Sequence, residues 1–284
     1  MSEALLFEQH RVFFNQFAEG YFKKISAYES DLFEPLNSSV KYSLLQNGKR
    51  FRPLLAMLVG EVFSTKKEVI APFALAIECI HTYSLIHDDL PCMDNDDFRR
   101  GQPTNHKKYS ESTALLAGDC LLTESFRILA DNYSNSDLLS HLIKLVSVRA
   151  GIYGMVGGQV LDLNAKDKIK SVADLQLLHQ LKTGALIAAA AAGAAKIANV
   201  SEEDQKNITE FAETLGLAFQ VADDILDQDQ KNEINKSFIY FLGLDKTKTY
   251  LQELTENAKQ SAKRLSVNSE ILCKLVDYNL NRNL

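Results

Sequence analysis

The sequence predicts an all-α protein, and three observations support that fold class. The 284 residues include five Pro and no Gly-, Ser- or Pro-rich linker, so we expect a single domain over residues 1–284. Hydrophobic residues make up 46% of the chain, and Leu, Ala, Lys, Glu and Gln are abundant relative to Val and Thr, which favours helices. The short Val and Ile clusters lack period-two alternation, so no strand is predicted.

The expected helices follow in order along the chain. Apolar residues at helical spacing fit one or two amphipathic helices in the first 30 residues. Asn47-Gly48 marks a turn, and Pro53 suits the first turn of a helix that continues through LLAMLVGEVF. Further helices are expected at about 69–90, 113–131, 137–158, 172–198, 202–227, 237–264 and 268–281.

Composition and charge argue against several classes of protein. The net charge of −6 disfavours a nucleic-acid-binding protein. The longest uncharged stretch, residues 183–195, is shorter than the roughly 20 residues that a membrane span requires. The four cysteines show no zinc-ligand spacing and no signal segment is recognised, so we expect free thiols and a cytoplasmic location.

Two groups of aspartates stand at the ends of apolar helical segments. They are Asp88, Asp89 and Asp94 after HTYSLIH, and Asp223, Asp224 and Asp227 after LGLAFQVA. Carboxylates gathered against apolar walls repel one another unless a cation neutralises them. Magnesium bound by the carboxylates would remove this repulsion, and phosphate oxygens would complete its coordination shell. We therefore interpret the two groups as two walls of one cavity.

The spacing within each group supports this interpretation. Asp223 and Asp227 are about 40° apart on a helix, so both can reach one metal site, and Gln220 shares their face. Asp88 and Asp94 are out of line on an ideal helix, but Pro91 disrupts the helix locally and can bring Asp94 back. The alternative for either group alone is a helix terminus followed by a charged loop.

Basic residues accompany the aspartates. They are Lys49, Arg50 and Arg52 in NGKRFRP, Arg99 and Arg100 after the first group, and Lys182 in LKTGAL. Arg forks and a Lys point charge suit diphosphate recognition. Taken singly, Lys49 and Arg50 are typical of a surface turn, whereas Lys182 beside a long apolar helix requires an anion.

Three further polar residues leave two interpretations open. His81 lies two helical turns before Asp88 with Ser84 between them, so it is either a ligand contact or a satisfied core histidine. Gln159 and Asp162 lie in GIYGMVGGQVLDL, which has no preceding strand and therefore is not expected to be a nucleotide loop. Those two residues either face the cavity or belong to a tightly packed helix.

Together, the motifs resemble those of the trans-prenyltransferases of the farnesyl and geranylgeranyl diphosphate synthase type. The matching segments, in order, are NGKRFRP, HTYSLIHDDLPCMDNDDFRRGQPTNH, LAGDCLLTESF, GMVGGQVLDL, LKTGAL and GLAFQVADDILD. The resemblance implies an isoprenoid-synthase-type helical bundle around a central cavity, normally a homodimer. It also implies condensation of isopentenyl diphosphate with an allylic diphosphate, dimethylallyl or geranyl.

The resemblance assigns roles to individual residues. The six aspartates would bind three magnesium ions that bridge to the allylic diphosphate. That diphosphate would be held by Arg99, Lys182 and Lys236, and the catalytic residues beside the developing cation would be Lys182, Thr183 and Gln220. The isopentenyl diphosphate would be held by Lys49, Arg52, His81, Arg100 and Arg282. Tyr83 and Ser84 match the chain-length positions of farnesyl-type members, which implies mainly farnesyl diphosphate as product.

One segment departs from the family pattern. Family members usually continue after DDILD with a long Gly- and Lys-rich loop, whereas here only QDQKNEI precedes Asn235-Lys236-Ser237. We expect weaker shielding of the allylic diphosphate and a larger role for Lys236, with Lys231 as a possible substitute for the missing lysine.

Several alternatives stay open at this point. A geranylgeranyl or geranyl diphosphate synthase would share these motifs. A terpene cyclase or a squalene-synthase-like protein would not need Lys49, Arg52, His81 and Arg100 for a second diphosphate. His87-Asp88 is similar to the doublet of metal phosphohydrolases, but the additional histidines are not suitably placed. The short lid also suggests a non-catalytic partner subunit of a heteromeric prenyltransferase.

Overall fold

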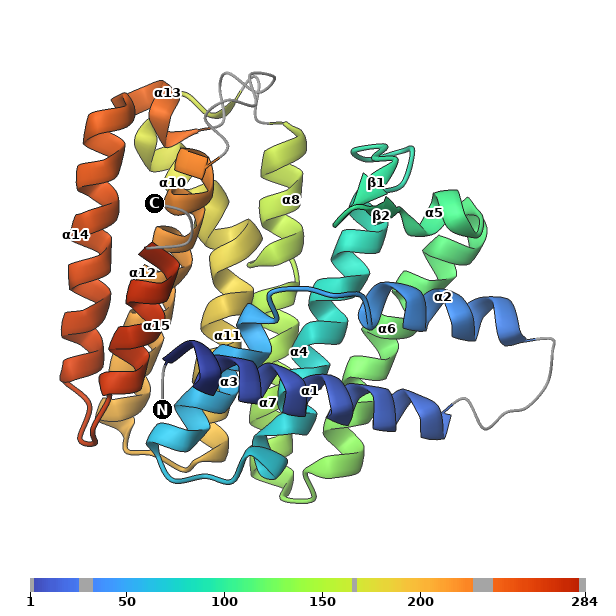
Figure 1. The fold of residues 1–284 in the computed structure, drawn as a ribbon, viewed down its shortest axis with the longest axis horizontal. Helices are drawn as coiled ribbons and strands as arrows, with labels where there is room; N and C mark the ends of the chain where they lie inside the picture. Colours follow the sequence, from blue (N-terminus) through green and yellow to red (C-terminus); the bar gives the residue numbers. More distant parts are fainter. Residues whose placement is uncertain (1–2, 26–32, 165–167, 227–236, 281–284) are drawn as a thin grey trace. The chain divides into compact units, whose positions relative to one another are not determined.

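The computed structural model describes residues 3–25, 33–164, 168–226 and 237–280 (Figure 1). Contacts divide the chain into two compact units. Unit 1 comprises Met1–Met57 and Glu68–Leu139, and unit 2 comprises Leu58–Lys67 and Ser140–Leu284. The expectation of a single domain over residues 1–284 stays a prediction.

Unit 1 is built mainly of helices around one buried helix, α4. Its elements are α1 (Glu3–Ile25), α2 (Glu34–Leu44), most of α3 (Phe51–Val62), α4 (Lys67–Asp88), β1 (Phe98–Arg99), β2 (Gln102–Pro103), α5 (Asn105–Lys108) and α6 (Glu111–Asn132). Every residue of α4 from Ile70 to Ile80 is buried. The polar end of α4 at Asp88 therefore emerges directly from the core of this unit.

Among the described residues, α4 is long and apolar enough to cross a membrane. However, 78% of its apolar window is buried inside the structure. A helix that is apolar on all sides is expected in a protein core as well as in a bilayer. The burial identifies α4 as a core helix.

Unit 2 consists of helices packed side by side (Figure 1). Its elements are most of α7 (Ser136–Ala150), α8 (Met155–Leu163), α10 (Val172–His179), the π-helix η2 (Gln180–Gly184), α11 (Ala185–Ile197), α12 (Glu202–Leu226), α13 (Phe238–Leu242), α14 (Leu244–Lys263) and α15 (Glu270–Leu280). Within this unit α12 packs against α11, η2, α14 and α15. Asp223 and Asp224 thus lie in the last turn of the helix that packs against most of the others in this unit.

Small residues bring α11 and α12 close together. All residues of α11 from Ala185 to Ala195 are buried. A Cβ built on Gly216 of α12 would lie only 3.0 Å from the Cα of Gly184, the residue before α11, and 3.7 Å from the Cβ of Ile187 in α11. The alanine run is therefore a close-packed helix surface, as the sequence predicted.

The sequence-based prediction of helices is largely confirmed. Helix boundaries at Lys67, Glu111, Glu202 and Glu270 lie within two residues of those expected. Serine side chains cap four of the described helices: Ser110, Ser171, Ser201 and Ser237 each accept a hydrogen bond from the backbone N–H three residues later. The four cysteines are free thiols, as predicted.

Four details of the prediction need correction. The helix expected at 137–158 is broken between Ala150 and Met155 by a turn. The helix expected at 237–264 is broken at Gly243, whose φ of 78° ends α13. A helix at Glu34–Leu44 was not expected, and the prediction of no strand is wrong because β1 and β2 form an antiparallel pair. Two-residue strands are too short to show an alternating pattern.

Candidate active site

The first aspartate group lies in a loop that folds back on the end of α4. The helix ends at Asp88, three residues before Pro91. The backbone N–H of Asp94 then donates to the Asp88 carbonyl at 2.9 Å, and Asn95 adopts a left-handed φ of 54°. The chain is thus turned so that the backbones of Asp88 and Asp94 meet, in the way expected from the sequence.

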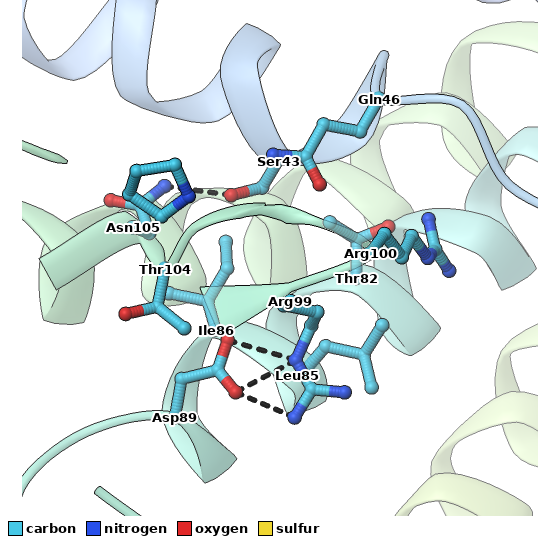
Figure 2. A pocket seen from close by; sticks show the side chains of 11 residues that line it. Ser43, Gln46, Thr82, Leu85, Ile86, Asp89, Arg99, Arg100, Thr104 and Asn105 are labelled. Carbon is cyan, nitrogen blue, oxygen red and sulfur yellow. Dashed lines mark hydrogen bonds and ion pairs between the residues drawn. The ribbon is translucent and has the colours of Figure 1, made fainter. Parts of the chain in front are cut away.

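The second residue of the doublet, Asp89, holds an arginine (Figure 2). Asp89 is only 3% exposed, and its two carboxylate oxygens accept hydrogen bonds of 2.7 and 2.9 Å from Nε of Arg99. Nη2 of Arg99 lies 2.5 Å from the same carboxylate. Burial opposes the positive charge of Arg99, but hydrogen bonds and attraction from the Asp89 carboxylate raise the pKa of Arg99 above its ordinary value. This arrangement fixes the direction of the Arg99 guanidinium.

Arg99 and Arg100 stand on the β1–β2 hairpin. The register pairs Arg99 with Gln102, so Arg100 and Gly101 form a two-residue turn, with φ of 53° and 75°. Positive φ at both positions is what a type I′ turn requires, and this turn fits the twist of a hairpin well. The hairpin is anchored by the Thr104 hydroxyl, which donates to the Asp96 carbonyl at 2.8 Å.

The loop between α2 and α3 contains a buried ion pair. Arg50 is 4% exposed, and its Nη1 donates to Glu78 Oε1 of α4 at 2.8 Å. Its Nη2 donates to the carbonyls of Leu44 and Gln46, each at 2.7 Å, and its Nε donates to Asn15. The prediction that Arg50 belongs to a surface turn is therefore wrong, whereas its neighbour Lys49 is exposed.

His81 lies among arginines. Burial holds the pKa of His81 well below its usual value, and Arg52, Arg100, Arg99 and Arg50 lower it further. The imidazole is therefore neutral near pH 7. Arg50 and Arg99 are paired with Glu78 and Asp89, but the four arginines still bring positive charge near one ring in a chain whose net charge is −6. A strongly negative group is the ligand that such a surface favours.

Tyr83 and Ser84 occupy the same helix between His81 and Asp88. Tyr83 is 7% exposed, and its ring meets the His87 ring edge to face at 5.7 Å. The Ser84 hydroxyl donates to the His81 carbonyl at 2.9 Å. Gly118 of α6 makes room for His87, because a Cβ there would lie 2.0 Å from the ring nitrogen Nε2.

In unit 2, the π-helix η2 presents Lys182 and Thr183. Lys182 Nζ lies 2.5 Å from Asp162 Oδ2 of α8. The Thr183 hydroxyl donates to Gln220 Oε1 of α12 at 3.2 Å. Because π-turns shift the register of a helix by one residue, they commonly occur at functional sites. Gly158 allows α8 to approach this turn, since a Cβ there would lie 2.2 Å from the Lys182 backbone nitrogen.

The second aspartate group continues from Gln220 along α12. The amide of Gln220 donates to Asp223 Oδ2 at 3.4 Å. Asp224 Oδ2 accepts the backbone N–H of Phe238 at 2.7 Å, which links the end of α12 to the start of α13. The side chains of Thr183, Gln220 and Asp223 thus form one connected polar chain.

Three buried side chains of unit 2 have polar atoms without a well-aligned hydrogen bond to the described residues. They are both amide atoms of Gln159, both ring nitrogens of His179, and Oδ1 of Asn279. His179 is 8% exposed and stacks on Phe238 with ring centroids 5.6 Å apart. Burial lowers the pKa of His179 to about 4, against the effect of Asp162, so the ring is neutral at pH 7.

The structure thus brings some predicted site residues together. It joins Asp88 to Asp94, Asp89 to Arg99, Thr183 to Gln220, and Gln220 to Asp223. Within the described parts of the chain, no three His, Cys, Asp or Glu side chains are grouped closely enough to hold a metal ion. The predicted site residues Asp227, Lys236 and Arg282, and also Lys231, lie outside the described residues.

Comparison with known proteins decides the family. The polyprenyl synthetase family model matches residues 33–269. The chain belongs to this family. It is 43% identical over 270 residues to the farnesyl diphosphate synthase of Haemophilus influenzae, covering 93% of this chain and 89% of that protein. It is 38% identical over 261 residues to the geranylgeranyl diphosphate synthase of Cyanophora paradoxa, covering 86% and 87%.

A solved structure of this family is also similar. The geranyltransferase of Helicobacter pylori, crystallised with magnesium and isoprenyl diphosphate, superposes with a TM-score of 0.81 at 32% identity. The match covers 99% of this chain and 97% of that one. The predicted isoprenoid-synthase-type fold is confirmed, and the protein is a trans-prenyltransferase. An enzyme of this family is not the non-catalytic partner subunit that was considered as an alternative.

Proposed function

We propose that this prenyltransferase condenses isopentenyl diphosphate with dimethylallyl and then geranyl diphosphate to give mainly farnesyl diphosphate. The observation that carries the proposal is the basic cluster of unit 1, in which Asp89 holds Arg99 on the hairpin that also carries Arg100, and Arg52 and Arg100 lie close enough to His81 to lower its pKa. A second diphosphate site of this kind is needed for condensation and is superfluous for cyclisation of one diphosphate. The farnesyl diphosphate synthases among the relatives support the same assignment.

A magnesium requirement fits the donor set of the chain. Carboxylate oxygens are the ligands that this hard cation prefers. Asp88, Asp94, Asp223 and Asp227 would hold three ions, and the bound metal supplies positive charge that stabilises the departing diphosphate. The H. pylori relative crystallised with magnesium and isoprenyl diphosphate supports this proposal.

The second aspartate of each doublet is assigned a supporting role. Asp89 already accepts the Arg99 guanidinium, and Asp224 accepts the Phe238 N–H. Asp89 therefore orients Arg99 of the hairpin after α4, and Asp224 links the end of α12 to the start of α13. Arg99, directed by Asp89, is in this way prepared to bind the allylic diphosphate.

The allylic side of the reaction is assigned to four of the described residues. Arg99 and Lys182 bind the allylic diphosphate and stabilise the charge that develops on it as its carbon–oxygen bond breaks. The oxygens of Thr183 and Gln220 present partial negative charge to the allylic carbocation. After the new carbon–carbon bond forms, the released diphosphate accepts the proton that is lost. Lys236 would add a cation from the short segment after α12.

The isopentenyl diphosphate is assigned to the arginine-rich side. Lys49, Arg52 and Arg100 bind its phosphate oxygens as charged donors, and His81 donates a hydrogen bond from its neutral ring. Arg282 at the C-terminus would complete the set. Binding fixes the double bond for attack on the cation, which removes the entropic cost of bringing the two substrates together.

Tyr83 is proposed as the floor that limits product length. Its ring lies in the core, one residue deeper than Ser84 on the helix that ends at Asp88. By backbone rise, Tyr83 is about 7.5 Å from Asp88 along that helix. A growing chain that follows α4 would therefore stop at this aromatic. The geranylgeranyl diphosphate synthase of C. paradoxa, at 38% identity, makes the longer product the second candidate.

Product analysis tests the function and the floor together. The purified protein is offered isopentenyl diphosphate with dimethylallyl, geranyl or farnesyl diphosphate in turn, with magnesium present. We expect farnesyl diphosphate from the first two and little product from the third. Tyr83→Ala should shift products to twenty carbons or longer, whereas Tyr153→Ala at a position that is 77% exposed should leave them unchanged. An unaltered distribution in Tyr83→Ala would refute the floor.

Two further expectations belong to this proposal. We expect the protein to act as a homodimer in the cytoplasm, and light scattering that gives the mass of one chain would refute the dimer. We also expect the short lid to bind allylic diphosphate weakly. Lys236→Ala should therefore raise the KM for allylic diphosphate more than that for isopentenyl diphosphate, and equal changes would contradict this role.

A further inference from the structure

We propose that Gly48 is a positioning residue for Arg100, because its missing side chain leaves the space in which the Arg100 guanidinium rests. The inference rests on the proposed role of Arg100 in binding isopentenyl diphosphate. It adds a residue that contacts no substrate yet determines how strongly that substrate binds.

The contact is close. A Cβ built on Gly48 would lie 2.6 Å from Nη1, 2.9 Å from Cζ and 3.3 Å from Nη2 of Arg100. A real Cβ requires about 3.5 to 4.0 Å to a carbon, so the guanidinium would have to move. The φ of Gly48 is not positive, unlike that of Gly101 or Gly243. Space for Arg100, and not a left-handed backbone, is therefore the reason for glycine at this position.

The backbone of Arg100 is fixed, so only the end of its side chain can adjust. Arg100 occupies the left-handed region, which a non-glycine residue adopts only where its surroundings impose it. On one side of the turn Arg99 is bound to Asp89, and on the other side the Pro103 carbonyl accepts the Tyr42 hydroxyl at 2.7 Å. The base of the Arg100 side chain is thus held at a defined place.

The loop that carries Gly48 is fixed as well. Arg50, two residues later, is bound to Glu78 and to the carbonyls of Leu44 and Gln46. This buried network prevents the loop from retreating when a methyl group is added at Gly48. Two rigid segments therefore meet at a flexible guanidinium, and the added methyl group displaces the guanidinium alone.

The displaced group belongs to the predicted anion site. Gly48 directly precedes Lys49, and Arg100 and Arg52 both lower the pKa of His81, so these groups lie near one ring. The planar fork of an arginine binds phosphate oxygens only in a restricted set of directions. A shift of the guanidinium therefore weakens diphosphate binding without removing a charge.

The experiment is a double-mutant cycle on the full chain with Gly48→Ala, Arg100→Ala and the double variant. We expect Gly48→Ala to raise the KM for isopentenyl diphosphate about tenfold, with the allylic KM and the thermal midpoint unchanged. In the Arg100→Ala background, Gly48→Ala should add nothing, because the group that it displaces is absent. Gly20→Ala is the matched control, since nothing lies within 4 Å of a Cβ there.

The outcomes separate this inference from the proposed function. If Arg100→Ala leaves the KM for isopentenyl diphosphate unchanged, the proposed role of Arg100 is wrong. If Arg100→Ala raises that KM but Gly48→Ala has no effect, or has the same effect in both backgrounds, the inference is overturned. A drop of the thermal midpoint on Gly48→Ala in both backgrounds would also overturn it, because it would show damage to the fold and not displacement of Arg100.

Discussion

The two aspartate doublets stand at equivalent places, each at the end of a helix with a buried apolar face, yet their surroundings differ. In both, the second aspartate holds the segment that follows: Asp89 binds the Arg99 side chain and Asp224 binds the Phe238 backbone. The first link joins opposite charges, whereas the second is a hydrogen bond to a neutral group. An aspartate near a helix end therefore orients an arginine side chain in unit 1, whereas in unit 2 it binds a backbone N–H of the next helix.

The wider environments extend this contrast. Unit 1 places several arginines around His81 and holds one of them by the buried Arg50–Glu78 pair. Unit 2 holds its site with a neutral histidine, small residues, a π-turn and the Lys182–Asp162 pair, whose side chains are more exposed than those of Arg50 and Glu78. Charged groups are costly to leave unpaired in a protein interior, and neutral groups are less so. Substitutions in unit 1 should therefore cost more than equivalent ones in unit 2.

The largest effect is expected at the buried ion pair. Glu78→Ala leaves Arg50 buried without its carboxylate, which should lower the free energy of unfolding by about 3–5 kcal/mol. Denaturant titration measures this loss. Glu253→Ala, at an exposed position of α14, is the control and should change stability by less than about 0.5 kcal/mol. A loss below about 1 kcal/mol in Glu78→Ala would show that Arg50 finds other partners.

The first aspartate of each doublet provides the next test. Asp88→Asn and Asp223→Asn should each lower kcat by about 10²- to 10³-fold, which corresponds to roughly 3–4 kcal/mol of transition-state stabilisation. Stability should change little, and activity of the unsubstituted protein should vanish when magnesium is removed by a chelator. An undiminished kcat in either variant would refute the metal assignment of that helix end.

His179 gives unit 2 a pH-dependent contribution to stability, in the same direction as that of His81 in unit 1. Its pKa of about 4 lies below the ordinary value of 6.5, so the unfolded chain binds a proton that the folded protein does not between those values. Stability should therefore fall as pH is lowered from about 6.5 to 4, by at most about 3 kcal/mol from this group. His179→Gln should remove that part of the slope in denaturant titrations. If both proteins show the same slope, His179 is not buried as a neutral ring.

The smallest expected difference concerns the second aspartates. Asp89→Asn removes the charge that holds Arg99, at a cost of about 1.5–3 kcal/mol, and should raise the KM for allylic diphosphate. Asp224→Asn keeps an oxygen that can accept the Phe238 N–H, so its effect should be no more than about 1.5 kcal/mol. Steady-state kinetics with both variants decides the matter. A larger loss of kcat in Asp224→Asn than in Asp89→Asn would mean that Asp224 acts as a metal ligand.

Sequence reasoning located the helices and the two doublets because both depend on local pattern. A helix with a buried face repeats its apolar residues every three to four positions, and the aspartates follow such repeats directly. The return of Asp94 to Asp88 was also predictable, since it involves a short loop around Pro91. The breaks at Gly151–Gly154 and Gly243 were not, because single glycines within a helical pattern are compatible with either continuation or termination.

The amino-acid sequence by itself determined the fold class, the positions of both aspartate groups and the resemblance to the polyprenyl synthetase family. Only the tertiary structure decided that Arg50 is buried against Glu78, that Asp89 holds Arg99, and that Gly48 leaves space for Arg100. The physical reason is that helical periodicity is set by neighbours within one or two turns, whereas these contacts join segments brought together by packing. Which charge meets which partner is therefore settled by the fold.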